Sequence, residues 1–513
     1  MDTAAHEPLL THAGRNRSAR QPHAIVIGSG FGGLAAAVRL GARGYRVTVL
    51  ERLDGPGGRA YVFRQDGFTF DAGPTIITAP FLLEELWHLC GKRLADHVQL
   101  KSLEHFYRIR FEDGSIFDCL QDDQAMREEV ARIAPADVDG YDRFMRASEA
   151  IYKIAFEQLS SEPFSSFTDM LRILPALVKL QAYRTVHELA ARCVREPKLQ
   201  FALSFHPLFL GGNPFATTAV YGLVAFLERR WGVHFAMGGT GSLVTGLVDL
   251  IKGQGNEVQY NREVAAITVE SQRATGVRLA SGETIPADLV VSNADSAWTY
   301  RHLLPAGVSR RWTRRRIDGA RYSMSLFVWY FGTRRQYPDV PHHTILVGPR
   351  YRELLADIFE RKVLAEDFSL YLHRPTATDT SLAPSGCDAF YVLSPVPHQG
   401  SGVDWKVRAE PYRKAIAQHL SATLLPELEE NVVTSRLMTP LDFQDRLLSF
   451  RGAAFGLEPI LTQSAWFRPH NCSEGVERLY LVGAGTHPGA GVPGVLSSAK
   501  VLDKVVPDAA QLV

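Results

Sequence analysis

The feature that most constrains this chain is a glycine-rich turn between short apolar stretches near its N-terminus. Residues 28–33, GSGFGG, have the spacing G-x-G-x-x-G and lie between apolar stretches at 24–27 and 34–40. A further apolar stretch, 46–50, ends at Glu51. This order predicts strand, turn, helix and strand, with a pyrophosphate at the helix N-terminus and the Glu51 carboxylate on an adenosine ribose. The sequence therefore predicts a Rossmann-like dinucleotide-binding fold.

A second glycine turn, residues 55–59, indicates which dinucleotide is bound. Its sequence, GPGGR, follows Glu51 closely. A nicotinamide dehydrogenase has no need of it, whereas flavoproteins with two dinucleotide-binding domains have a similar turn whose arginine approaches the pyrophosphate and the flavin. Gly-Pro-Gly is also common in ordinary loops. Next to the acidic strand end, the turn favours FAD over NAD.

The first 22 residues superficially resemble a secretion signal, because Arg15, Arg17 and Arg20 precede an apolar run. Glycines interrupt that run, and its removal would also remove the nucleotide site. We therefore predict a disordered polar extension at 1–22.

Composition excludes several classes of function. Lys plus Arg number 56 and Asp plus Glu 55, so the net charge of +1 offers no concentrated positive charge for nucleic acid. The five cysteines are scattered and form no C-x-x-C pair, which favours a reduced, cytoplasmic setting with inert thiols. No apolar run approaches the roughly 18 residues that a spanning helix needs.

The middle of the chain is predicted to be helical. Around 164–180 the leucines at 171, 174 and 177 share one helical face. Such a helix is usually a core helix with one solvated side. The alternative is an interfacial helix that dips into a bilayer with Lys and Arg at the headgroups. The stretch 204–226 has almost no charge, which suggests the lining of an apolar cavity.

Three strongly apolar segments, 323–332, 368–374 and 389–398, predict a mostly antiparallel sheet with one face lining a pocket. Histidines lie in or near these elements and the charge-free stretch, but no two have metal-ligand spacing. A lone histidine is more often a satisfied core residue, and we predict no metal site. The four histidines are His206, His343, His373 and His398.

The C-terminal part predicts the other wall of a flavin site. A strand at 479–482 leads into a glycine-rich loop, 483–494, and then into a helix from 495. Such a loop brings backbone against a planar ligand, and the helix N-terminus stabilises negative charge on a reduced flavin. Related flavoproteins often have Asp where this chain has Ala484, so the ribityl contact is expected from elsewhere.

Seven motifs over residues 23–500 resemble the bacterial and fungal type of phytoene desaturase: IVIGSGFGGLAAAVRL, DGPGGRAYVF, GFTFDAGPTIIT, FHPLFLGGNPFATT, EDFSLYLHRP, EPILTQSAWFRPHN and LYLVGAGTHPGAGVPGVLSSAK. The resemblance implies an FAD enzyme, peripherally attached to membranes, that inserts double bonds into phytoene, a linear C40 polyene. Each double bond costs the substrate a hydride, which flavin N5 accepts, and a proton. His206, Glu458 or water could accept that proton. Oxygen or a quinone would reoxidise the flavin.

Two other functions remain open on the sequence. An amine oxidase would use the same fold, but it needs an aromatic cage and a polar pocket. A carotenoid carrier or isomerase would retain the flavin without introducing double bonds.

We therefore expect an α/β protein made of three parts. These are a discontinuous FAD-binding domain (23–80, 235–300 and 470–513), a substrate-binding domain with an antiparallel sheet (81–121 and 301–469), and a helical insertion that forms a membrane-contacting lid (122–234). The residues expected to contact FAD are Gly28, Gly30, Phe31, Gly32, Gly33, Glu51, Arg52, Gly58, Arg59, Val264, Gly483, Ala484, Gly485, Gly491 and Val492.

Overall fold

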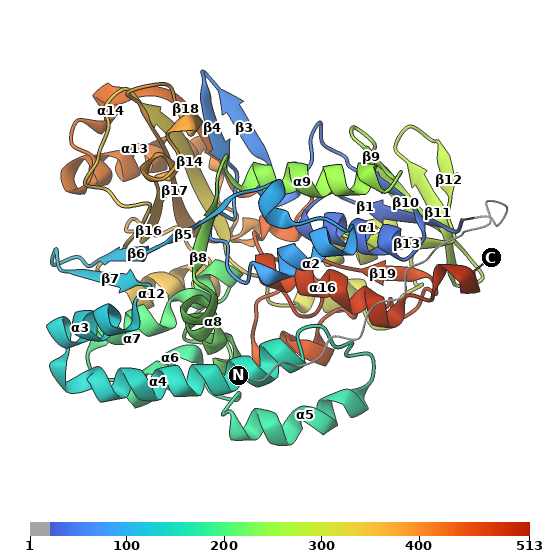
Figure 1. Cartoon of the computed structure of the whole chain (residues 1–513), viewed down its shortest axis with the longest axis horizontal. Helices are drawn as coiled ribbons and strands as arrows, with labels where there is room; N and C mark the ends of the chain where they lie inside the picture. The colour runs from blue at the N-terminus through green and yellow to red at the C-terminus, as the bar shows by residue number, and fades with distance from the viewer. Residues whose placement is uncertain (1–20, 513) are drawn as a thin grey trace.

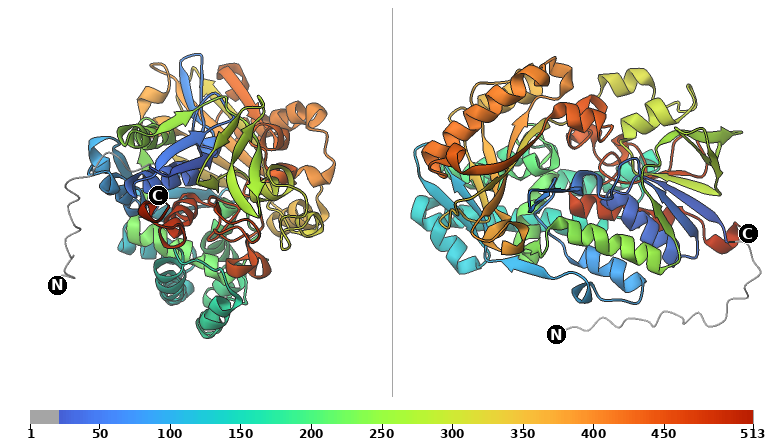
Figure 2. Two further views of the ribbon diagram at one scale, coloured as in Figure 1. Left: turned by 90° about the vertical axis from the view of Figure 1, so that its right-hand side faces the viewer. Right: turned by 90° about the horizontal axis from the view of Figure 1, so that it is seen from above.

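The computed structural model describes residues 21–512, so positions 1–20 of the predicted extension lie outside the described residues. It shows a mixed α/β fold with two principal sheets. In Figure 1 the sheet nearer the C-terminus contains β1, β13 and β19, the sheet at the opposite end contains β14 and β17, and a group of helices lies below. The view from above, on the right of Figure 2, shows the same separation of the two sheets.

The first sheet is parallel and has the strand order β19-β13-β1-β2-β9. Its central strand, β1, is buried along its whole length, as the apolar stretch predicted. Helices pack on it because their apolar faces meet the buried strands, and α1 contacts both α9 and α16. The strands are β1 His23–Ile27, β2 Arg46–Leu50, β9 Glu257–Gln259, β13 Leu289–Ser292 and β19 Leu479–Leu481, and the helices are α1 Phe31–Ala42, α2 Phe81–Leu89, α9 Thr240–Gly253 and α16 Val492–Val505.

The second sheet has seven strands in the order β18-β14-β17-β16-β15-β6-β7. All neighbours are antiparallel except β15 and β6. Every residue of β14 is buried, in line with the absence of a polar alternation in its sequence. The strands are β6 His105–Arg110, β7 Ile116–Leu120, β14 Ser325–Thr333, β15 His343–Leu346, β16 Leu370–His373, β17 Asp388–Val396 and β18 Val432–Met438, and helix α13, Trp405–Thr423, packs beside them.

Two further strand pairs and a three-stranded sheet complete the strands of the described residues. One pair is a hairpin of β3 and β4, which turns at Asp66 and Gly67. The second pair is β5 with β8, and the three-stranded sheet contains β10, β11 and β12. The bounds are β3 Val62–Gln65, β4 Phe68–Asp71, β5 Leu100–Leu103, β8 Val233–Ala236, β10 Val264–Glu270, β11 Arg273–Leu279 and β12 Thr284–Pro286.

Helices make up most of the segment 122–232, and strand β8 follows from Val233. The helices of this segment form the lower layer in Figure 1. They are α3 Asp123–Ile133, α4 Val138–Ile151, α5 Phe167–Lys179, α6 Val186–Cys193, α7 Pro197–Ser204 and α8 Leu223–Trp231. No helix among the described residues is long and apolar enough to cross a bilayer.

Helix α5 corrects one interpretation of its sequence. Its N-terminus is fixed by a capping box between Ser166 and Asp169, yet none of its residues is buried. Leu171 and Leu174 are 53% and 49% exposed. The core-helix interpretation was therefore wrong, because the 3.6-residue apolar period does not reveal what the apolar face meets.

One helix boundary differs from expectation. Helix α16 begins at Val492 and not at 495. Pro493 lies in its first turn, where a missing N–H costs nothing.

Candidate FAD and substrate site

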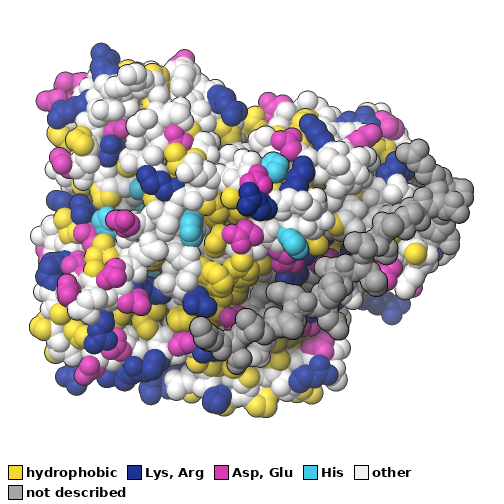
Figure 3. All heavy atoms as spheres, viewed as in Figure 1, with side chains coloured by type: hydrophobic (Ala, Val, Ile, Leu, Met, Phe, Trp, Pro, Cys, Tyr) yellow, Lys and Arg dark blue, Asp and Glu magenta, His cyan; other side chains and the backbone are white. Residues whose placement is uncertain are grey.

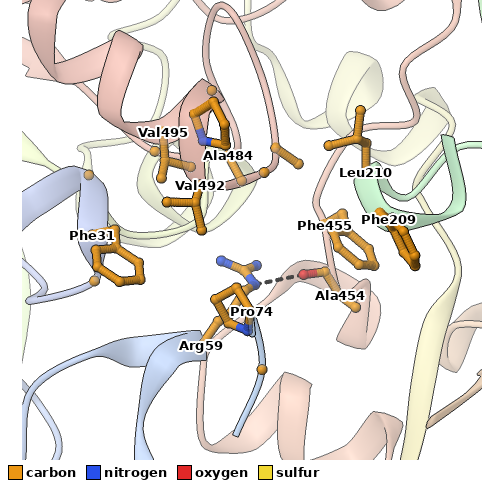
Figure 4. Close-up of a pocket in the computed structure, with 18 of the residues that line it drawn as sticks. Phe31, Arg59, Pro74, Phe209, Leu210, Ala454, Phe455, Ala484, Val492 and Val495 are labelled. Carbon is orange, nitrogen blue, oxygen red and sulfur yellow. Dashed lines mark hydrogen bonds between the residues drawn. The ribbon is translucent and has the colours of Figure 1, made fainter. Parts of the chain in front are cut away.

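One continuous cavity runs from the nucleotide fold to the seven-stranded sheet. At one end it is lined by Gly28, Glu51 and Val264, and at the other by side chains of β15, β16 and β17. Figure 4 shows the part between them, where Arg59 and Pro74 face Val492 and Ala484 across the cavity. All fifteen residues expected to contact FAD come from the segments around this end, and all but Gly33 and Gly485 line the cavity.

The glycines around α1 are required by close backbone contacts. A Cβ on Gly33 would lie 2.1 Å from the carbonyl oxygen of Gly28. A Cβ on Gly32 would lie 2.6 Å from Oδ1 of Asn293 and 2.9 Å from the backbone nitrogen of Gly483. The N-cap, Gly30, provides no side-chain cap. The first-turn N–H groups of α1 are therefore left to an anion at the cavity wall.

Glu51 ends β2 with its side chain buried, and its carboxylate is fixed in place. Oε2 accepts hydrogen bonds from the backbone N–H and the hydroxyl of Ser29, at 2.8 and 2.6 Å, and Oε1 accepts one from the N–H of Leu53 at 2.8 Å. A carboxylate oxygen can accept more than one hydrogen bond. Glu51 therefore keeps capacity for a ribose hydroxyl at the point where it lines the cavity.

Arg59 places a cation in the middle of the cavity. Its Nε donates to the carbonyl oxygen of Ala454 at 2.6 Å (Figure 4), and another guanidinium nitrogen donates to the hydroxyl of Ser449 at 3.1 Å. Burial lowers the pKa of Arg59, and the charge of Asp295 opposes this change. Within the described part of the chain no carboxylate lies at ion-pair distance from Arg59, so its charge is available to a ligand.

Arg52 and Gly58 are held differently. The Arg52 side chain pairs with Glu263 at 3.2 Å and donates to the backbone oxygens of Asp445 and Arg446. It therefore joins two segments of the cavity rim. Gly58 has φ +58°, and the N–H of Gly57 beside it donates to the carbonyl oxygen of Ser29 at 3.0 Å, which holds the two glycine turns side by side.

The C-terminal loop forms the opposite wall. Gly483 and Gly491 both have φ +93°, and Gly491 is the N-cap of α16 with no side-chain cap. A Cβ on Gly485 would lie 2.5 Å from the hydroxyl of Ser296. Two uncapped helix N-termini, an available guanidinium and a glycine-lined gap thus face one cavity, and this donor set fits the pyrophosphate and planar ring of FAD.

Beyond the flavin region the cavity is almost entirely apolar and aromatic. Phe209, Leu210 and Phe455 form its wall next to Arg59 and Pro74 (Figure 4). Further lining comes from Phe201, Phe205, Leu208, Leu223, Met324, Leu326, Val328, Ile345, Leu370, Tyr371 and Leu393. The predicted apolar lining by the charge-free stretch 204–226 is therefore present in the structure.

A buried carboxylate interrupts this lining. Glu228 of α8 is 4% exposed and lines the cavity. Its Oε1 accepts from the hydroxyl of Tyr107 at 2.6 Å, and its Oε2 lies 3.2 Å from Nε2 of His206. Sequence reasoning missed Glu228, because Arg229 and Arg230 beside it suggest an exposed helix end.

The candidate proton acceptors lie in different places. His206 lines the cavity and contacts Glu228. Glu458 is buried outside the cavity lining and is ion-paired with Arg321 at 2.8 Å. His398 is buried in a loop away from the cavity lining, whereas His343 and His373 lie together on neighbouring strands.

Helix α5 borders the cavity at its other side. Met170, Ile173 and Leu177, spaced by three and four residues, line the cavity. Phe167 and Leu171 face outward. One helix thus separates an apolar cavity from the exterior with apolar side chains on both faces.

Comparisons with known proteins agree with this site. The family described as flavin containing amine oxidoreductase matches residues 31–501. A neurosporene-forming phytoene desaturase of Cereibacter sphaeroides is 50% identical over 95% of both chains. A lycopene-forming phytoene desaturase of Pantoea ananas is 48% identical, covering 93% of this chain and 97% of its own.

Solved structures support the fold alone. Putrescine oxidase with bound putrescine superposes with a TM-score of 0.63 at 14% identity, covering 95% of this chain and all of its own. An oxidoreductase of Methanosarcina mazei has a TM-score of 0.60 at 18% identity. The cavity has one end that fits FAD and one apolar end, and the family model and the relatives cover nearly the whole chain. The chain therefore belongs to the flavin-containing amine oxidoreductase family, among its bacterial carotenoid desaturases.

Proposed function

We propose that this protein is an FAD-dependent phytoene desaturase that forms neurosporene- or lycopene-type products. The observation that carries the proposal is the single cavity with a dinucleotide end and a long apolar end. An amine substrate would need polar groups to bind its nitrogen, and the lining beside Arg59 and Pro74 is apolar (Figure 4). Relatives named phytoene desaturases cover nearly the whole chain.

Forming each double bond removes a hydride from one carbon and a proton from its neighbour, while the C–H electron pair left behind becomes the new π bond. FAD, when bound, supplies the hydride acceptor. The glycine turns, Glu51 and Arg59 would hold it. Phe209, Leu210 and Phe455 would position the polyene and exclude water.

The proton acceptor that the geometry favours is His206. The Glu228 carboxylate accepts from Nε2 of His206, which leaves the Nδ1 lone pair as a base. Within the described residues Nδ1 has no hydrogen-bond partner. Glu228 itself is oriented by Tyr107. Glu228 is thus a positioning residue for His206, in the way a carboxylate orients a catalytic imidazole.

The test uses purified protein with FAD and phytoene in liposomes, under air or with a quinone, and follows products by chromatography. New, more unsaturated polyenes are expected. Unchanged phytoene under both acceptors would refute the proposal, and isomers without new double bonds would identify an isomerase.

His206→Ala should lower kcat by about 10² or more, the usual contribution of a general base. Flavin content should stay unchanged. Glu228→Gln should give a smaller loss and shift the pH profile of kcat. His398→Gln, a buried histidine outside the cavity, is the matched control, and equal losses in all three variants would rule out this role.

We further propose that α5 attaches the protein peripherally to the cytoplasmic face of a membrane and acts as a lid. Its exposed side chains Phe167, Leu171, Leu174 and Val178 follow one helical stripe. Figure 3 shows hydrophobic side chains, with Lys and Arg among them, along the lower edge where Figure 1 places α5. The polyene would then reach the cavity from the bilayer.

Arginines next to α5 support this orientation. Trp466 packs against Phe167 with ring centroids 5.1 Å apart, and Arg311 lies 4.1 Å above the Trp466 ring. The following segment carries exposed Arg314, Arg315 and Arg316. Each basic side chain near an anionic surface contributes about 1 kcal/mol. Flotation of the protein with neutral and with anionic vesicles tests whether α5 binds a membrane. A protein that floats with neither kind of vesicle would refute the proposed attachment.

A further inference from the structure

Three histidines lie together behind the wall of the cavity. His343 of β15 and His373 of β16 are directly opposite each other in the antiparallel pair, and His342 immediately precedes β15. One ring nitrogen from each residue lies within 4.8 Å of those of the other two. All three side chains are buried, with exposed fractions of 6% for His342 and 1% for the others.

The hydrogen bonds leave this cluster incomplete. Nδ1 of His342 bonds to the hydroxyl of Thr378 at 2.6 Å, and Nδ1 of His343 bonds to the hydroxyl of Tyr371 at 2.7 Å. Within the described part of the chain, Nε2 of His343 and Nδ1 of His373 have no partner. Most buried polar atoms in folded proteins have a hydrogen-bond partner, so these two nitrogens are open to a further ligand.

The spacing suits a cation. Nε2 of His342 and Nε2 of His373 are hydrogen-bonded to each other at 3.0 Å, a bond that an ion bound to both nitrogens would replace. Two nitrogens bound to one tetrahedral Zn²⁺ at its usual bond length are about 3.3 Å apart. The outer nitrogens of His342 and His343 already have hydroxyl partners, the arrangement that orients imidazole ligands around a metal.

The surroundings do not oppose a cation. Arg374 is ion-paired with Asp388 at 3.0 Å, and Lys101 is exposed to solvent. The aromatic rings of Phe235 and Tyr391 pack against the histidine cluster. The protein ligands of a bound cation would therefore be the three imidazole nitrogens. Imidazole sets of this kind suit Zn²⁺ and neighbouring late first-row metals, with hydroxide or water at the fourth position.

We propose that His342, His343 and His373 bind one divalent late first-row cation, Zn²⁺ in the first place, at a site separate from the flavin. The ion joins β15 to β16 and, through His343, fixes Tyr371, which lines the cavity. The spacing of histidines along the sequence does not reveal this site, because His342 and His373 are 31 positions apart.

The test measures zinc per chain by elemental mass spectrometry, on full-length flavin-bound protein dialysed against a zinc buffer. About one zinc per chain is expected in the wild type and in His419→Gln, a control histidine on α13. His343→Gln with His373→Gln should reduce zinc at least fivefold, with flavin content confirming the fold. Equal zinc in all three proteins, or almost none in the wild type, would overturn the proposal.

A milder variant addresses the risk that the double substitution fails to fold. Thr378→Val removes the partner of His342 Nδ1 and should weaken zinc affinity about 10-fold or more, as loss of an outer partner does. Competition with a chromogenic chelator measures this. An affinity equal to that of the wild type would show that His342 is not a ligand.

Discussion

Gly33 illustrates how closely residues of the nucleotide site are packed. Its position allows no Cβ, because the atom would lie 2.1 Å from a backbone oxygen that cannot move independently of β1. Gly33→Ala should therefore shift α1, with overpacking costing about 1–3 kcal/mol or more.

The expected result for Gly33→Ala is loss of most bound flavin and a lower Tm, measured by visible absorbance and thermal unfolding. Gly319→Ala is the control, since a Cβ at that position meets nothing within 4 Å. If both variants retained flavin equally, the packing argument would fail.

His398 predicts a specific pH dependence of stability. Its buried ring accepts a hydrogen bond from the N–H of Gly400 at 2.9 Å, which only the neutral form can do. Burial, with Lys362 and Arg451, lowers its pKa to about 4. Because the unfolded state takes up the proton first, stability is fully present above about pH 6.5 and is lost as the pH falls toward 4, by about 3 kcal/mol at most.

Denaturant unfolding at pH 7 and pH 4 checks this. His398→Gln should lose less stability than the wild type between these two values, whereas a change at exposed His88 should behave like the wild type. Parallel losses in both variants would contradict the assignment.

At the residue scale, the sequence predicted positions whose role depends on the local backbone. It did not predict contacts between side chains that are far apart in the sequence. The glycines and Glu51 could be found because their spacing reflects one turn and one strand end. Glu228 could not, because its partners Tyr107 and His206 lie 121 and 22 positions away. The histidine cluster was missed for the same reason.

Among elements, α5 has two apolar stripes, one lining the cavity and one exposed. Replacing its outward leucines, as in Leu171→Ser with Leu174→Ser, removes about 3 kcal/mol of burial in a bilayer and should weaken vesicle binding about 100-fold. Vesicle flotation measures this.

The matched control for the α5 variant is Val407→Ser, which changes a side chain that is 66% exposed on α13. Its vesicle binding should equal that of the wild type. Equal weakening in both variants would show that general surface hydrophobicity, and not α5, governs attachment.

Most strands and helices were predictable from apolar periods, because those periods follow backbone geometry. What an apolar helix face packs against was not predictable from the sequence. The same pattern fits a protein core or a lipid surface, so α5 stayed ambiguous until its exposure was known.

For the whole molecule, the length of the cavity should set how far desaturation proceeds. Ile345 lines the cavity from β15, in the seven-stranded sheet. Ile345→Trp should shorten the space into which the polyene advances and shift products toward fewer new double bonds, with flavin content unchanged.

Chromatography of products over time checks this expectation. Val433→Trp, at a position 45% exposed on β18, is the control. An unchanged product ratio for the Ile345 variant would show that the reach of the polyene is not limited at this end.

At this scale, periodicity predicted two sheets and a helical layer, but not which distant segments join. The strands of the parallel sheet come from opposite ends of the chain, with β19 beside β13. Only the resemblance to a family linked them in advance, because the pairing depends on non-local burial that no short pattern records.

Helix α5, with one apolar face toward the cavity and the other toward the exterior, has a kinetic consequence. If the polyene enters beside α5, the protein takes its substrate directly from the membrane. The effective substrate concentration is then the number of moles of substrate per mole of lipid. Adding empty membrane would then slow turnover although the amounts of enzyme and substrate in the tube are constant. The affinity of such an enzyme is properly expressed as a surface mole fraction.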